Sequence, residues 1–327
     1  MKTAIFRNRI LKAAAALLCV SLCFVLSSCS NAKHLSSGND GAQLTVVATI
    51  FPQYDFAKNI SGGTASVKML LPMGADIHSY EPTPKDIKTI QNCDLLIYTG
   101  GENDAWIDDI LKSMGKKVPA TLKLIDCVST VKEKQASGMQ AEGGFLGKSS
   151  DDIDEHVWTS PKNAITITEK IKDKMCSLDT ADAAKFKANA ARYEARLGAL
   201  DRSYTKTINA SDGRTILVAD RFPFRYLAED YGLKYYAAFP GCSGTTEPNA
   251  STIAYLTKTI NTKHIHYIFY TEMSNHKTAD AIAEDTGAKE LLLHSCHNVS
   301  SKDVSSGADY ISIMEQNLKN LKKALND

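Results

Sequence analysis

Residues 289–297 read KELLLHSCH, a short apolar run that leads directly into two histidines. A run of this length is typical of a buried β-strand, which we place at 289–293. Comparable runs occur at 44–51, 67–71, 95–99, 122–126, 215–219, 234–239 and 266–270. Helical stretches separate these runs, so strand and helix alternate through two series of four strands. Such alternation predicts parallel sheets that are covered by helices on both faces.

Helices are expected between the strands, at 105–114, 224–231, 252–260 and 277–285. Thr83-Pro84 should begin another helix, because threonine is a favoured N-cap and proline suits the first helical turn. Between the two series, 161–209 is almost wholly helical, with apolar residues at spacings of three and four. The residues from 131 to 152 are rich in glycine, serine and lysine and are expected to form an exposed loop.

We therefore predict an α/β fold with two similar lobes, residues 44–160 and residues 210–327. Each lobe is expected to hold a four-stranded, mostly parallel sheet flanked by helices. The segment 161–209 is expected to join the lobes as a long, rigid connecting helix. The composition, 43% hydrophobic and 23% charged over 327 residues, is sufficient for a sizeable core and for two such lobes.

The N-terminus has the pattern of an export signal with a lipid-attachment site. Four basic residues precede the apolar run 13–26, which is too short for a membrane span of about 20 residues. The run ends in LSSC, which resembles a bacterial lipobox whose cysteine, Cys29, is acylated and becomes the mature N-terminus. We expect a signal peptide at 1–28 and a flexible tether at 29–43. The protein is then extracytoplasmic and anchored to the bacterial cell membrane by its N-terminal lipid.

Charge and cysteine content exclude two other classes of protein. Without its four basic residues in the signal, the chain has 34 basic and 37 acidic residues, a net charge of about −3. Nothing in this balance indicates a nucleic acid as partner. Five cysteines remain after the signal and Cys29 are set aside, an odd number that argues against a disulfide scaffold. A bridge between Cys242 and Cys296 stays open.

Three histidines in loop-type settings indicate a metal site. They are His78 in GADIHSYEPTP (74–84), His156 in DEHVWTSP (154–161) and His294 in LLLHSCH (291–297). Imidazole is the commonest protein ligand for transition metals. His78 and His294 each follow a predicted strand, and ligands of open α/β sheets gather outside the carboxyl ends of the strands. The sequence therefore predicts a metal ion held between the lobes.

From about residue 44 to the C-terminus, the chain resembles the metal-ion (zinc/manganese) solute-binding lipoproteins of ABC importers, the TroA-like cluster A-I. The loop around His78, the stretch 154–161, YGL at 231–233 and DTGA at 285–288 carry the resemblance. It implies one divalent ion between two lobes, delivered to an ABC permease and its ATPase by a protein we expect to be a monomer. It also places His78 and His156 on the two ligand positions of the N-terminal lobe.

The C-terminal lobe departs from the pattern that the resemblance implies. A histidine is usual after its first strand, where ADRFPF at 219–224 places Arg221. A guanidinium stays protonated and cannot bind a cation, so we expect Arg221 to pair with a carboxylate such as Glu272 or Glu102. The last ligand position, usually an aspartate, is occupied by His294. Glu102, after the third strand, matches a glutamate that some zinc-binding members place near the ion.

The predicted metal ligands are His78, His156, His294 and Glu102. The fourth ligand has open alternatives, namely Asp220, His297, Cys296 or water, and His297 or Cys296 could also take the place of His294. Three imidazoles with one carboxylate or water suit Zn²⁺ in tetrahedral geometry. Mn²⁺ prefers more oxygen ligands and is the second choice.

Two functions of other classes fit the same residues less well. Three histidines with an open position could activate water in a metalloenzyme. However, the sequence has no His-Glu-x-x-His helix and no obvious general base beside the ligands, so we predict that the protein is not an enzyme. A surface adhesin or structural lipoprotein built on the same fold is the remaining alternative. His264, His266 and His276 are expected on strands or the surface, and Trp106 and Trp158 in the core.

Overall fold

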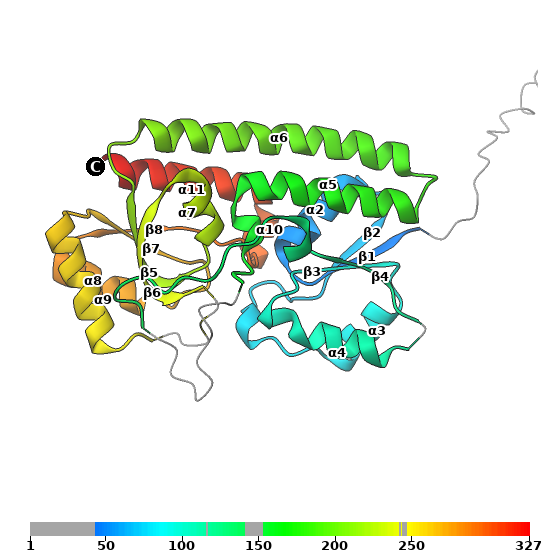
Figure 1. Cartoon of the computed structure of the whole chain (residues 1–327), viewed down its shortest axis with the longest axis horizontal. Coiled ribbons are helices and arrows are strands. Elements are labelled where there is room, and N and C mark those ends of the chain that lie inside the picture. Colours follow the sequence, from blue (N-terminus) through cyan, green and yellow to red (C-terminus); the bar gives the residue numbers. More distant parts are fainter. Residues whose placement is uncertain (1–42, 116, 141–152, 242, 244–246) are drawn as a thin grey trace, which may run out of the picture. The chain divides into compact units, whose positions relative to one another are not determined.

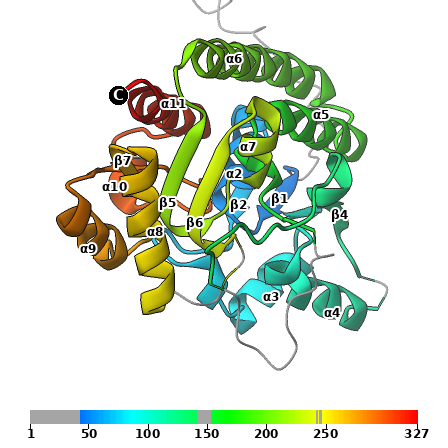
Figure 2. The same cartoon turned by 60° about the vertical axis from the view of Figure 1, so that its left-hand side comes forward.

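The computed structural model describes residues 43–115, 117–140, 153–241, 243 and 247–327 (Figures 1 and 2). The predicted signal peptide, Cys29, nearly all of the tether, Cys242 and residues 141–152 of the predicted loop lie outside these ranges. The described residues form two four-stranded sheets in which every pairing is parallel, so the predicted fold class is confirmed. Within the same ranges, each helix is too short or too polar to cross a membrane.

The N-terminal sheet has the strand order β2-β1-β3-β4. Its strands are β1 (Thr45–Ala48), β2 (Ser66–Met69), β3 (Leu95–Tyr98) and β4 (Ala120–Lys123), and its helices are α2 (Phe51–Ser61), α3 (Pro84–Gln91) and α4 (Ala105–Ser113). The central strands β1 and β3 are apolar and almost entirely buried, as expected for a sheet with both faces covered. Thr83 caps α3 as predicted, and its hydroxyl accepts from the backbone N–H of Asp86.

The C-terminal sheet repeats this arrangement with the order β6-β5-β7-β8. Its strands are β5 (Thr215–Phe222), β6 (Lys234–Pro240), β7 (Tyr267–Tyr270) and β8 (Lys289–Leu292). Its helices are α7 (Arg225–Tyr231), α8 (Ala250–Lys263), α9 (Lys277–Thr286), α10 (Ser301–Ser305) and α11 (Tyr310–Asn326). Strand β5 runs three residues beyond its predicted end, after a register shift between Val218 and Arg221.

The connecting segment consists of two helices, α5 (Pro161–Leu178) and the longer α6 (Ala183–Ala210). Helix α6 packs against α2 of the N-terminal lobe and against α11 of the C-terminal lobe (Figure 1). Two buried tyrosines fix these contacts. Tyr193 donates to Asp55 in α2 at 2.8 Å, and Tyr204 donates to the backbone carbonyl of Met314 in α11 at 2.7 Å. The same helix is thereby bonded to both lobes.

A buried carboxyl in the segment between β3 and α4 gives the stability of this fold a pH dependence. Asp104 is 2% exposed and accepts from the backbone N–H of Thr99 at 2.6 Å. Burial outweighs this hydrogen bond and raises the pKa of Asp104 from 3.8 to about 7. The folded state therefore keeps a proton that the unfolded state has released, and stability falls as pH rises from about 4 to about 7.

We expect the stability of Asp104→Asn to lack this pH dependence, because the amide keeps an acceptor oxygen but does not ionise. Between pH 5 and pH 7.5 the wild-type protein should lose roughly 2–3 kcal/mol relative to the variant. Thermal unfolding of both metal-free proteins at the two pH values measures this difference. A difference that stays constant with pH would mean that Asp104 is ionised throughout.

Candidate metal centre

Three histidine rings from distant parts of the chain meet between the two sheets. The ring of His297 lies 4.8 Å from that of His156 and 5.6 Å from that of His78, between centroids. His78 is in the short 3-10 helix η1 (Ile77–Ser79) that follows β2, and His156 directly precedes η4 (Val157–Thr159). His297 follows β8 in the C-terminal lobe. The N-terminal lobe thus supplies two rings and the C-terminal lobe one.

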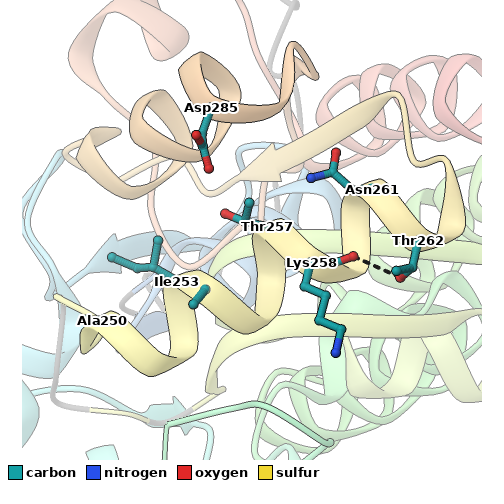
Figure 3. A pocket seen from close by; sticks show the side chains of 8 residues that line it. Ala250, Ile253, Thr257, Lys258, Asn261, Thr262 and Asp285 are labelled. Atoms are coloured by element: carbon teal, nitrogen blue, oxygen red, sulfur yellow. Dashed lines mark hydrogen bonds between the residues drawn. The ribbon is translucent and has the colours of Figure 1, made fainter.

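The rings of His78 and His297 border a small cavity of about 30 Å³ that both lobes line, and His156 packs behind them, against His297. His78 and His297 line it together with Asp76, Arg221 and Glu272. Since a water molecule requires about 10–15 Å³ of such volume, the cavity has room for a metal ion and one further small ligand. A larger hollow of about 610 Å³ lies elsewhere, on the surface between α8 and α9, and its lining has no histidine or cysteine (Figure 3).

His156 is oriented by the carboxylate of Asp154. Its ring Nδ1 and its backbone N–H both lie 2.9 Å from Asp154 Oδ1. A carboxylate only accepts, so Nδ1 carries a hydrogen, and in the neutral ring Nε2 keeps its lone pair. Burial favours the neutral ring, but Asp154 outweighs it and raises the pKa of His156. Nε2 is buried and has no hydrogen-bond partner within the described chain, as a ligand atom for a metal would be.

His297 is oriented through a longer chain of hydrogen bonds. Ser295 Oγ donates to Glu272 Oε1 at 2.5 Å and lies 2.6 Å from His297 Nδ1. Because the hydroxyl gives its single hydrogen to Glu272, it must accept from Nδ1–H of His297, which leaves the lone pair on Nε2. Burial first, and then the neighbouring His156 and His78, lower the pKa of His297 well below its usual value. Its Nε2 is also buried and unpartnered among the described residues.

The loop that carries His297 is bonded to the N-terminal lobe. Trp158 Nε1 donates to the carbonyl of Ser295 at 2.8 Å, and the backbone N–H of Phe51 donates to the carbonyl of His297 at 3.2 Å. Asn298 donates to two carbonyls of the loop before η1, at 2.6 and 2.9 Å. The loop also turns at Cys296, whose positive φ of 62° is unusual for a residue other than glycine. His297, which follows this turn, lines the cavity, whereas His294, which precedes it, does not.

His294 and Glu102 lie outside the lining of this cavity. Nδ1 of His294 accepts from the backbone N–H of Cys296 at 3.0 Å, so that lone pair is already used. The backbone N–H of His294 donates to Asn317 of α11 at 2.8 Å. Glu102 is exposed at the start of η2 (Glu102–Asp104). The structure thus brings His78 and His156 together with His297, one of the alternatives that the sequence left open.

Arg221 pairs with a carboxylate as predicted, but this is Asp76 and not Glu272 or Glu102, the two examples that the sequence suggested. Its Nη1 lies 3.3 Å from Asp76 Oδ2, and the other oxygen of this carboxylate accepts from the backbone N–H of His78 at 3.0 Å. Glu272 is instead held by the backbone N–H and the hydroxyl of Ser295. The pair therefore links β5 of the C-terminal lobe to the loop of His78.

Asp220, another open alternative, has both carboxylate oxygens bonded to protein donors in this structure. Its Oδ1 accepts from the backbone N–H of Arg221 and its Oδ2 from the hydroxyl of Thr271, both at 2.8 Å. It is absent from the lining of the cavity. Cys296 is a buried free cysteine whose burial raises its pKa well above the usual value, which disfavours the thiolate that a metal requires.

A tighter group of acidic and imidazole side chains occurs at the N-terminus of α9. The ligand atoms of His276, Asp280 and Glu290 all lie within 4.8 Å of one another. Asp280 is exposed. The burial of Glu290 and the neighbouring charge of Asp280 both raise the pKa of Glu290. Exposed acidic groups of this kind are common without a metal. The three central histidines are less closely grouped, and His78, which is partly exposed, is the outer member.

Gly241, after β6, allows the backbone to approach His156. A Cβ at this position would lie 2.8 Å from Cε1 of the His156 ring and 3.0 Å from the backbone oxygen of Phe222. Because the backbone cannot yield easily, Gly241→Ala should displace the ring and weaken zinc binding by about tenfold. Isothermal titration measures the effect, with Gly198→Ala as control, since a Cβ there makes only ordinary contact with Arg202. Unchanged affinity for Gly241→Ala would contradict the close approach.

Comparison with known proteins places this geometry in a family. The model of the family "ZnuA: Zinc-uptake complex component A periplasmic" matches residues 46–324. The zinc-binding lipoprotein AdcA of Streptococcus pneumoniae is 34% identical over 309 residues, which are 94% of this chain and 60% of that protein. The chain thus spans about 60% of the length of this relative.

One further relative and one solved structure also cover most of the chain. The high-affinity zinc uptake system protein ZnuA of Bacillus subtilis is 31% identical over 94% of this chain and 97% of its own length. The crystal structure of the Zn(II)-bound ZnuA-like domain of S. pneumoniae AdcA superposes with a TM-score of 0.72. It is 31% identical and covers 88% of this chain and 100% of that one.

Proposed function

Because the chain belongs to the ZnuA family of zinc-uptake components, we propose that it binds Zn²⁺ outside the cytoplasm and delivers it to the permease of an ABC importer. The observation that carries this proposal is the pair of buried, unpartnered Nε2 atoms of His156 and His297 within the described chain, beside His78. The names of the relatives support zinc as the cargo, since AdcA and the B. subtilis protein are both named for it.

The ligand set that we propose is His78, His156 and His297. It keeps the two predicted ligands of the N-terminal lobe and replaces His294, whose Nδ1 accepts from the backbone. Three neutral imidazoles favour zinc over manganese, which prefers oxygen ligands. In a tetrahedral zinc site, ligand nitrogens lie roughly 3.4 Å apart. His78 should therefore move inward when the metal binds.

A binding protein fits this cavity better than an enzyme does. The cavity of about 30 Å³ has room for an ion and a small ligand, but not for a peptide or an ester that a metal-bound water could attack. The relatives are likewise named as zinc-binding and zinc-uptake proteins. We therefore regard the metal as cargo, carried by a monomer with one site.

The test is a titration of metal-stripped protein with Zn²⁺ and, separately, with Mn²⁺ at pH 7.5. We expect one equivalent of zinc to bind, at least 100-fold more tightly than manganese. Binding should weaken toward pH 5.5, because protons compete for the imidazole nitrogens. A preference for manganese, or no stoichiometric binding, would refute the proposal. Transport is tested by deleting the gene and measuring growth and zinc content in zinc-limited medium.

We also propose that Cys29 carries the lipid that anchors the protein to the membrane. The motif LSSC at 26–29 supports this, as does the name of the pneumococcal relative, a zinc-binding lipoprotein. The wild-type protein should fractionate with membranes, and Cys29→Ala should be neither acylated nor cleaved before residue 29. Intact-mass measurement of both proteins distinguishes them. An unmodified mature N-terminus downstream of Cys29 would be the contrary result.

A further inference from the structure

Arg221 is a fixed cation beside a proposed cation site. It lines the cavity, and its side chain is 14% exposed. Its Nη1 donates to Asp76, while its Nε is buried and has no partner among the described residues. A guanidinium stays protonated, so Nε carries a hydrogen that lacks an acceptor. Leaving a buried donor unsatisfied costs free energy, which a ligand that reached this donor would recover.

The carboxylates that line the cavity are already engaged. Asp76 accepts from Arg221 itself and from the backbone of the loop that carries His78. Glu272 accepts from the backbone N–H and the hydroxyl of Ser295. The three proposed histidine ligands therefore leave the fourth position of a tetrahedral zinc to a ligand from solution.

We propose that Arg221 binds a small monovalent anion such as chloride, which completes the coordination of the zinc held by the three histidines. The inference rests on the proposed function. The anion displaces a metal-bound water, so one metal–oxygen bond breaks, one metal–anion bond forms, and Nε–H of Arg221 donates to the anion. The cavity of about 30 Å³ limits this ligand to roughly the size of one water molecule and excludes a bulky metal chelate.

Cobalt(II) tests the proposal, because its visible absorption reports the ligands around the ion. The full chain is loaded with cobalt and titrated with sodium chloride, while sodium perchlorate keeps the ionic strength constant. We expect a saturable spectral change in the wild-type protein. In Arg221→Met the apparent chloride affinity should fall at least tenfold. In Arg221→Lys it should fall about threefold, since lysine keeps the charge but has no donor at the position of Nε.

Arg225 provides a matched control in the same lobe. Its side chain is 16% exposed, it pairs with Glu229 at 2.7 Å, and its Nε is also buried without a partner in the described chain. It differs from Arg221 in not lining the cavity. Arg225→Met should therefore respond to chloride as the wild-type protein does.

Three results would overturn the proposal. A cobalt spectrum that is indifferent to chloride would assign the fourth position to water or a protein group and leave zinc capture intact. Equal chloride affinity in Arg221→Met and the wild-type protein would show that Arg221 does not hold the anion. If Arg221→Met failed to fold, equal affinity in Arg221→Lys would have the same meaning. Failure of the wild-type protein to bind cobalt or zinc would instead refute the proposed function itself.

Discussion

His156→Ala should lower the zinc affinity about 1000-fold, or roughly 4 kcal/mol at 25 °C. The ring is fully buried, and its Nε2 is aligned for a metal by the hydrogen bond between Nδ1 and Asp154. Removing it takes away one of the three proposed ligands and also leaves the buried Asp154 carboxylate without the ring that it pairs with. Isothermal titration measures the affinity, with competition by a chelator where binding is too tight for direct titration.

The variant Asp154→Asn tests how much the orientation of the His156 ring contributes to zinc affinity, because the ring itself remains in place. The amide retains an acceptor for the backbone N–H of His156 but loses the charge that fixes the tautomer, so zinc affinity should fall 10- to 100-fold. Circular dichroism of the metal-free variants shows whether each still folds. If His156→Ala folds and binds zinc with unchanged affinity, His156 is not a ligand. The proposed centre would then be wrong.

His297→Ala should weaken zinc binding at least 100-fold, or about 2.7 kcal/mol, whereas His294→Ala should weaken it less than tenfold. Both rings belong to one loop, but of the two only His297 has an Nε2 that is buried and unpartnered among the described residues. His294 supports the loop, since its Nδ1 accepts from Cys296 and its backbone is bonded to Asn317. His266→Ala serves as a control of the same residue type outside the site.

The reverse order, with His294→Ala the more damaging, would restore His294 as the ligand predicted from the sequence. It would leave His78 and His156 in place and mean that the loop rearranges when the metal binds. Cobalt spectra of the two variants distinguish these cases, because loss of an imidazole ligand changes the absorption, whereas loss of a supporting ring changes mainly the affinity.

Much of the fold follows from the order of the apolar runs. All eight strands lie at or within a few residues of their predicted positions. The central strands β1 and β3 are the clearest, because they are almost entirely buried and read as apolar runs. Helix α2 was not predicted. Its first residues, Phe51 and Pro52, continue the apolar run of β1, and the change to a helix is marked mainly by the proline at its first turn.

The site was less predictable, because it depends on how one loop turns. Proximity to the end of β8 favours His294, but the positive φ of Cys296 carries the chain on to His297. A signal for His297 was present in the sequence. Ser295 stands two residues before it, and its hydroxyl accepts from the backbone N–H of His297, as Asp154 does for His156. The same spacing precedes His276, so the pattern alone does not identify a site.

The pairing of Arg221 could not be read from the sequence at all. Asp76 and Arg221 are 145 residues apart and belong to different lobes. Glu272 was an equally reasonable partner until the structure showed its two oxygens bonded to Ser295. Long-range pairing of this kind depends on the packing of whole elements.

The hydrogen bonds between the loop of His297 and the N-terminal lobe bear on how long the ion stays bound. Wide separation of the lobes would break the bonds from Trp158 and Asn298 and would strain α6, which Tyr193 and Tyr204 bond to both lobes. We expect these contacts to make such an opening rare. The departure of zinc should then depend on the short segment around His78, which is partly exposed and is paired with Arg221 of the opposite lobe through Asp76. A permease that shifts this one segment would set the residence time of the ion without breaking the other contacts between the lobes.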